Sequence, residues 1–143
     1  MDKTPAWKKA GNTDKWTEIL FRALASRVKK RWRFVSFRGL GGGEWKGVVD
    51  VLAIRKDTSK SDDELLKSGD LFDIVLVQMK GGFARKPSED EIDRLRVVAK
   101  RYDAKAIVLF QWKRGKGCTF KKLDAGTKWC DSSAKKIFGD KKQ

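Results

Sequence analysis

Apolar positions recur every three or four residues in two stretches of the chain, which predicts two amphipathic helices. The first stretch covers residues 14–30. The second is residues 88–102, where Ser88 and Glu91 have the spacing of a capping box. The apolar stripes are Trp16, Ile19, Leu20, Ala23, Leu24 and Val28 in the first stretch, and Ile92, Leu95, Val98, Ala99 and Tyr102 in the second.

Shorter runs rich in β-branched and aromatic residues predict five strands. They are residues 32–37, 45–54, 71–80, 105–112 and 118–123. The near-continuous apolar run FDIVLV in the third strand indicates a central strand covered on both faces. The strands on either side of the second helix are expected to be parallel, with a right-handed crossover. The predicted fold class is α/β, with a mixed central sheet flanked by helices.

The length of 143 residues suits one domain with one core. We expect a basic N-terminal arm at residues 1–12, the domain at residues 13–125 and a basic, weakly patterned tail at residues 126–143. No apolar run approaches the ~20 residues of a membrane helix. The first 16 residues lack the apolar stretch of a secretory signal, so we expect a cytoplasmic, nucleoid-associated protein.

The chain carries 34 Lys and Arg against 19 Asp and Glu, a net charge of +15, and it contains no histidine. A strongly basic chain favours a polyanionic partner, and nucleic acid is the simplest one. An anionic membrane is less favoured because the charge is spread along the chain instead of along one amphipathic helix. The lack of histidine excludes Ser-His-Asp triads, Cys-His pairs and histidine-based nuclease sites. Catalysis would depend on carboxylates, lysine, amides and a hard cation such as Mg²⁺ or Mn²⁺.

The two cysteines, Cys118 and Cys130, do not have the spacing of a zinc site. We expect two reduced thiols, with a disulfide as the alternative.

Three polar features interrupt the predicted strands. Asp50 lies in the apolar segment VVDVL, where an unpaired carboxylate would be costly to bury. Gln78 and Lys80 end the third strand two residues apart and therefore share a face, and Gly81 follows directly. If the strands are neighbours, Asp50, Gln78 and the carbonyl of Met79 could hold Mg²⁺, while Lys80 stabilises charge on a phosphate.

An aspartate in one strand followed by Gln-x-Lys at the end of the next resembles the signature of the PD-(D/E)xK nucleases. The predicted order helix–strand–strand–strand–helix–strand, over about residues 14–112, is similar to their restriction-endonuclease-like αβββαβ core. The closest likeness is to archaeal Holliday junction resolvases and Mrr-like restriction endonucleases, which carry a further acid on the first helix, where this chain has Glu18.

This resemblance implies a homodimeric, Mg²⁺- or Mn²⁺-dependent endonuclease that hydrolyses DNA phosphodiesters, with branched DNA as the junction-resolving case. It also implies roles for four residues: Asp50 and Gln78 as metal ligands, Glu18 as an accessory ligand and Lys80 as the catalytic lysine.

Two departures from that signature keep other functions open. No proline precedes Asp50, and Gln78 stands where the family has a carboxylate, which removes one negative charge. The alternatives are a nuclease-fold DNA-binding module that has lost its metal site and a basic RNA-associated protein. Phosphate contacts are predicted at Arg38, Lys46, Arg85 and Lys86.

Overall fold

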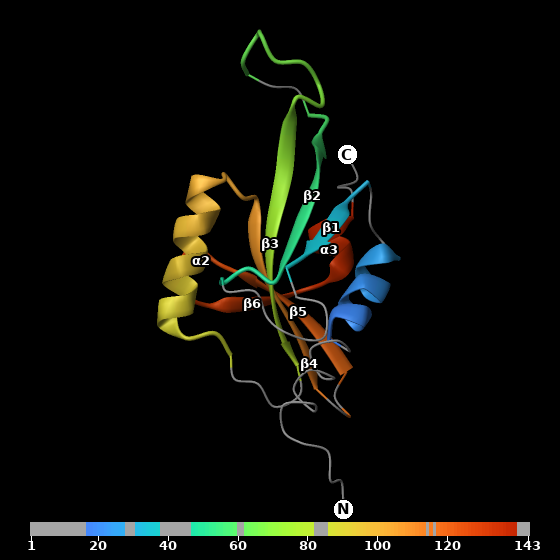
Figure 1. Ribbon diagram of the computed structural model, residues 1–143, viewed down its shortest axis with the longest axis vertical. Coiled ribbons are helices and arrows are strands. Elements are labelled where there is room, and N and C mark those ends of the chain that lie inside the picture. Colours follow the sequence, from blue (N-terminus) through green and yellow to red (C-terminus); the bar gives the residue numbers. More distant parts are fainter. Residues whose placement is uncertain are drawn as a thin grey trace, which may run out of the picture.

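A six-stranded mixed sheet with helices on both faces forms the protein in the computed structural model (Figure 1). The structure describes residues 17–27, 31–37, 47–59, 62–81, 86–113, 115 and 117–139. Residues 17–26 are helical. The remaining elements are β1 (Arg33–Ser36), β2 (Val51–Asp57), β3 (Leu71–Gly81), α2 (Glu89–Arg101), β4 (Ala106–Lys113), β5 (Gly117–Leu123), β6 (Trp129–Ser132) and α3 (Ala134–Phe138).

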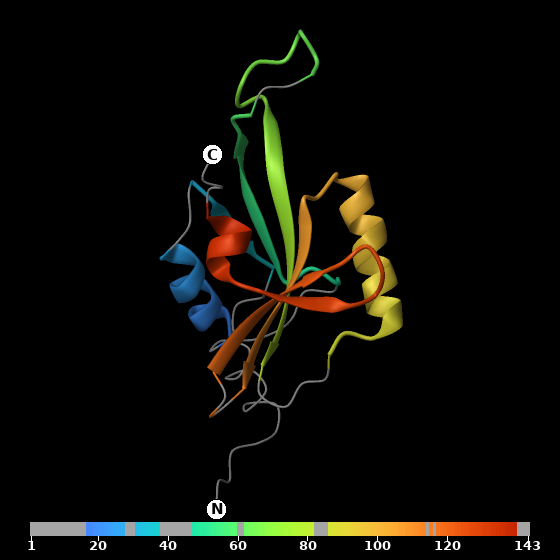
Figure 2. The same cartoon turned by 180° about the vertical axis from the view of Figure 1, so that it is seen from behind.

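The strands lie in the sheet in the order of the chain, β1-β2-β3-β4-β5-β6. β3 and β4 are parallel and are joined through α2, as the sequence predicts, and the other four neighbouring pairs are antiparallel. An antiparallel pair can be joined by a tight turn, whereas a parallel pair requires a crossover. The parallel pair therefore places α2 against the sheet directly after the end of β3 (Figure 2).

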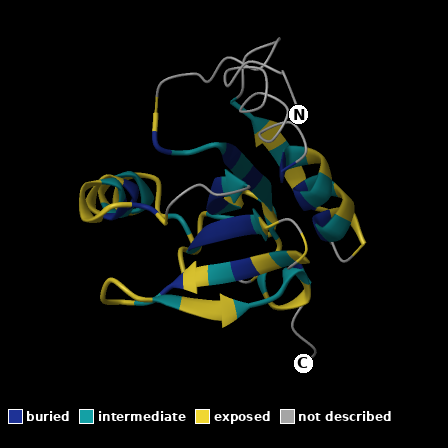
Figure 3. Ribbon diagram, turned by 90° about the horizontal axis from the view of Figure 1, so that it is seen from below, coloured by how far each residue is buried: buried dark blue, intermediate teal, exposed yellow. Residues whose placement is uncertain are grey.

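The two faces of the sheet carry two separate apolar clusters, because side chains alternate along each strand. Val75, Val77 and Met79 of β3 point to one face, where Phe21 and Ala25 of the first helix cover them. Leu76 points to the other face, where Ile92 and Leu95 of α2 cover it. Both clusters thus include β3, which confirms a central strand buried on both faces (Figure 3).

Helix α2 begins as the sequence predicts. Ser88 is the N-cap, and the capping box with Glu91 is complete. Ile92 and Leu95 are buried and Val98 and Ala99 are partly buried. Tyr102 does not belong to the buried stripe: it is the C-cap residue and is 61% exposed, because the helix ends before its side chain can reach the sheet. Within the described parts of the chain, no helix has both the length and the apolarity to span a membrane.

β2 begins later than predicted. The sequence favours a strand from residue 45, but the described residues 47–50 are irregular and the strand starts at Val51. Gly47 has a φ of 138°, a conformation that is available to glycine and not to the pleated strand. Residues 62–67, in the connection between β2 and β3, form a turn with a hydrogen bond from Leu66 N to Asp63 O. The late start of β2 places Asp50 directly before the first residue of this strand.

The prediction that residues 126–143 form a basic, weakly patterned tail is wrong for the residues of this segment that the structure describes. Residues 129–132 form β6, and α3 follows directly. Phe138 is fully buried and packs edge-to-face on Phe21, Trp32 and Phe34, while Trp129 packs against the cluster under α2. A few large aromatic residues anchor this segment, although Lys and polar residues dominate its composition.

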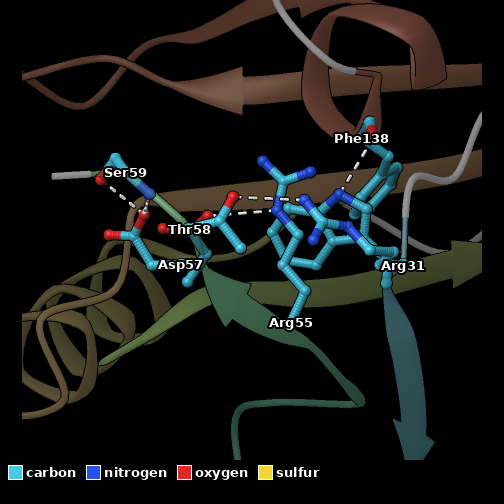
Figure 4. A network of polar contacts seen from close by, with 8 residues as sticks. Arg31, Arg55, Asp57, Thr58, Ser59 and Phe138 are labelled. Carbon is cyan, nitrogen blue, oxygen red and sulfur yellow. Dashed lines mark hydrogen bonds and ion pairs between the residues drawn. The ribbon is translucent and has the colours of Figure 1, made fainter. Parts of the chain in front are cut away.

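The β2–β3 hairpin extends beyond the rest of the sheet (Figure 1). A polar network joins the base of the hairpin to the face of the sheet that the first helix covers (Figure 4). The Arg55 guanidinium lies 4.4 Å from the centre of the Trp32 ring and donates to Asp73 at 3.1 Å. Trp32 Nε1 in turn donates to the carbonyl oxygen of Phe138 at 3.0 Å. The C-terminal helix and the hairpin are therefore both tied to Trp32.

Replacement of Phe138 by alanine tests whether α3 belongs to the core. We expect Phe138→Ala to lower the free energy of unfolding by about 3–5 kcal/mol, since it removes a fully buried ring from an aromatic cluster. The matched control is Lys136→Ala, an exposed position whose backbone hydrogen bond to Ser133 does not need the lysine side chain. Urea unfolding measures both. Equal stability of the two variants would mean that α3 does not contribute to the core.

Candidate functional site

Asp50 is fixed at the junction of three strands. Its N–H donates to the carbonyl of Val77, and its own carbonyl accepts from the N–H of Phe37, each at 3.0 Å. Its carboxylate accepts a hydrogen bond from the N–H of Met79 at 2.8 Å. The carboxylate thus continues the pairing along the edge of β3 beyond the first residue of β2. Because Met79 lies between Gln78 and Lys80, Asp50 meets β3 between those two positions.

Gln78 and Lys80 share the face of β3 that is covered by α2, and both contact the same carboxylate. Gln78 Nε2 donates to Glu91 Oε2 at 2.7 Å. Lys80 Nζ forms an ion pair with the same oxygen at 3.6 Å. Three of the predicted residues therefore gather at the end of β3, together with an acid from the following helix.

Glu91 has one oxygen for the helix and one for the sheet. Oε1 accepts from Ser88 in the capping box, and Oε2 accepts from Gln78 and pairs with Lys80. The sequence indicates only the capping role, because the capping box accounts fully for an acid at that position. The crossover gives a signal for its second role. The helix that follows β3 in a parallel crossover begins near the end of that strand, so an acid in its first turn can contact residues there.

The amide oxygen of Gln78 is unusual. The side chain is 4% exposed, and its Oε1 has no hydrogen-bond partner among the residues that the structure describes. A buried acceptor without a partner costs about 1–3 kcal/mol. The amide cannot be reversed to avoid this cost, because its oxygen would then face the Glu91 carboxylate. The site thus contains a buried oxygen with capacity for a cation or a donor.

A second glutamine extends the polar group across the sheet. Gln111 of β4 is the register partner of Lys80 and is only 6% exposed. Register partners on neighbouring strands share a face, so Gln111 lies beside Lys80 under α2. Gln111 is not among the site residues that the sequence predicts. The sequence marks this residue only weakly, as a single amide near the end of an apolar strand.

Other predicted site residues lie apart from this group or outside the described chain. Glu18 is on the first helix, which packs on the opposite face, and it pairs with Arg22 at 3.2 Å. For Met79 the structure shows the N–H engaged with Asp50, and the role of its carbonyl as a ligand stays a prediction. Lys86 is exposed between β3 and α2. Arg38, Lys46 and Arg85 lie outside the described residues.

The donor set is compatible with a hard divalent cation. Mg²⁺ takes oxygen ligands, often one or two carboxylates together with water and substrate phosphates. Asp50, Glu91 and Gln78 Oε1 supply oxygens of this type. No cluster of three or more His, Cys, Asp or Glu side chains that could hold a metal occurs within the described parts of the chain, so an all-carboxylate cage with Glu18 is not formed there.

A groove of about 960 Å³ lies at the other end of β3, around the base of the hairpin. Its basic residues include Arg31, Arg55 and Lys105, and its acidic residues include Asp57 and Asp73. Arg55 is already paired with Asp73, and Arg31 donates to Thr58 (Figure 4). The charges of this groove largely balance one another.

The pKa of Glu91 reports on this cluster. Burial raises the pKa of the carboxyl, but the hydrogen bond from Gln78, the charge of Lys80 and the hydrogen bond from Ser88 together lower it below its ordinary value. A lowered pKa in the folded state stabilises the protein above the ordinary glutamate pKa, and this contribution is lost as the pH falls through the lowered value.

We therefore expect Gln78→Leu to raise the pKa of Glu91, since the largest lowering interaction is removed while burial is retained. Carboxyl-detected NMR titration of ¹³C-labelled glutamate would measure the change, with Glu89 of the same helix as an internal reference. Urea midpoints at acidic and neutral pH should then differ less in the variant than in the wild type. An unchanged Glu91 titration would show that Gln78 does not act on this carboxylate.

The function of the protein has to be assigned from the chemistry of these side chains. In comparisons with known proteins, no family model, no curated protein and no solved structure matches the chain. An acid, an amide and an amine are nonetheless brought to one end of β3, with a second acid from α2. These four side chains are therefore the basis for a functional assignment.

Proposed function

We propose that the protein is a metal-dependent DNA endonuclease with a restriction-endonuclease-like core. The observation that carries the proposal is the meeting of Asp50, Gln78 and Lys80 at the end of β3, where Asp50 is hydrogen-bonded to the residue between the other two. The oxygens can hold a hard cation, and the ammonium can stabilise negative charge on a phosphate.

The arrangement of the elements supports this proposal. A helix, three antiparallel strands, a crossover helix and a parallel fourth strand give the αβββαβ order of the nucleases that the sequence resembles. β5, β6 and α3 extend that core at the β4 edge of the sheet. The site lies at the carboxyl end of β3, where the chain turns into the crossover.

Each side chain has a distinct task in this reaction. Asp50 and the Gln78 oxygen hold the cation, and the hydrogen bond from Met79 fixes the Asp50 carboxylate in place. Lys80 stabilises the negative charge that develops on the phosphate as water attacks. When bound, Mg²⁺ or Mn²⁺ would lower the pKa of a water molecule and polarise the phosphoryl oxygen.

The net charge of +15 supports DNA as the substrate, because basic side chains gain affinity through the release of counterions from the phosphate backbone. Branched DNA and a homodimer are the more specific proposals that follow from the likeness to junction resolvases. Two copies of the site would be needed to cut two strands.

A second candidate is a DNA-binding module without catalysis. The Lys80–Glu91 ion pair favours it, because the lysine already has an acidic partner in the absence of substrate. A basic RNA-associated protein is the third possibility and follows from charge alone. Mn²⁺ titration and cleavage assays on junction, flap, duplex and single-stranded DNA, with an RNA competitor, separate the three.

Asp50→Asn and Lys80→Met test the catalytic assignment. Asn retains an oxygen that can accept from Met79 N–H, and Met retains most of the lysine stem, so each variant removes mainly a charge. We expect each to reduce the cleavage rate by about 100-fold or more, since charge stabilisation of this kind contributes factors of 10²–10³. DNA affinity measured by fluorescence anisotropy should stay nearly unchanged.

The control variants are Asp62→Asn and Lys105→Met, which make the same substitutions at exposed positions away from the end of β3. They should cleave like the wild type. Full cleavage by the Asp50→Asn protein in both Mg²⁺ and Mn²⁺ would rule out the catalytic assignment.

Arg85 and Lys86 test the DNA-binding assignment. Replacement of one phosphate-contacting cation should weaken binding about equally for all sequences and reduce the slope of log K against log salt by about 1. We expect this result for Arg85→Ala and for Lys86→Ala, with Lys100→Ala at the far end of α2 as the control. An unchanged salt slope in both variants would contradict a phosphate contact at this loop.

A further inference from the structure

We infer that Glu91 supplies the second carboxylate of the cation site and replaces the charge that is missing at Gln78. This inference rests on the proposed metal-dependent function and names a residue that its signature does not include. It is argued from the contacts of Glu91 with the two functional positions of β3.

Glu91 reaches both of those positions with one oxygen. Oε2 lies 2.7 Å from Gln78 Nε2 and 3.6 Å from Lys80 Nζ. An acid that merely capped α2 would need only its contacts to Ser88, which Oε1 provides. The second oxygen is therefore available for the sheet without loss of the helix cap.

A separate observation indicates where a ligand would bind. Gln78 is 4% exposed, and its Oε1 has no partner among the described residues. This oxygen belongs to the same amide whose nitrogen donates to the Glu91 carboxylate. The end of β3 thus holds a carboxylate and an unsatisfied amide oxygen, which are ligands of the kind that a hard cation takes.

The same geometry explains why residue 78 is a glutamine. A glutamate there would place two carboxylates in direct contact at the distance now bridged by Gln78 Nε2, and like charges this close oppose each other's ionisation. With glutamine, the contact becomes a hydrogen bond that holds Glu91 in place. Compared with the signature that the sequence resembles, the negative charge then lies on α2 at Glu91 instead of on β3 at residue 78, and the site keeps it.

Glu91→Gln is the sharpest single test, because glutamine at this position of a capping box also accepts from the N-cap backbone. The variant keeps the helix cap and removes the charge. We expect Mn²⁺ affinity, measured by isothermal titration on the full chain, to fall about tenfold or more. Cleavage should fall by about 100-fold. The urea midpoint at neutral pH should also fall, because the variant loses the ionised partner of Gln78 and Lys80.

The exchange variant Gln78→Glu/Glu91→Gln returns the charge to the strand and keeps one acid and one amide in contact. We expect it to recover Mn²⁺ affinity to within about threefold of the wild type, since the same charge occupies the same space. Glu89→Gln, which removes an exposed charge from the same first turn, is the matched control and should bind Mn²⁺ like the wild type.

The outcomes separate this inference from the proposed function. If the wild type neither binds Mn²⁺ nor cleaves DNA, the proposed function fails, and the role of Glu91 fails with it. If the wild type does both and Glu91→Gln is indistinguishable from it, only the role of Glu91 is overturned. An exchange variant that stays as weak as Glu91→Gln would also overturn it, because the effect would then not be one of charge.

Discussion

The burial of β3 on both faces is the constraint on which the site depends. Apolar side chains cover this strand from the first helix on one side and from α2 on the other, so polar groups near its end have little access to water and depend on partners within the protein. Asp50 satisfies the Met79 N–H at the strand edge, and Glu91 satisfies the Gln78 amide on the α2 face. The same contacts that satisfy buried polar groups hold the candidate reactive groups in place.

The parts of the fold that could be predicted were those in which the local pattern and the tertiary environment agree. The apolar run of β3 and the Ser88–Glu91 capping box both determine structure locally, and both were confirmed. The start of β2 was missed because Val48 and Val49 are β-branched, yet the chain beside Gly47 is irregular. α3 was missed because only a long-range aromatic cluster, invisible to periodicity, makes Phe138 a core residue in a lysine-rich segment.

The candidate site divides in the same way. Asp50, Gln78 and Lys80 could be found from the sequence because polar residues stand out in apolar strands. Glu91 could not, because an acid in the first turn of a helix is fully explained by capping and by the helix dipole. Its second role depends on how α2 is placed relative to the end of β3, and that placement is a property of the crossover. When a local pattern already explains a residue, as capping explains Glu91, the sequence gives no sign of a second role.

Charge gives the strongest reason to connect this site with a cation. The chain as a whole is strongly basic, which attracts phosphate, whereas the candidate site at the end of β3 includes the carboxylates of Asp50 and Glu91. A phosphate that approached these two carboxylates would be repelled by their negative charge. A protein that only bound DNA would gain affinity from a neutral or basic side chain at either position. A local acidic site on a basic surface is advantageous if a divalent cation lies between the carboxylates and the phosphate, because the cation then attracts both.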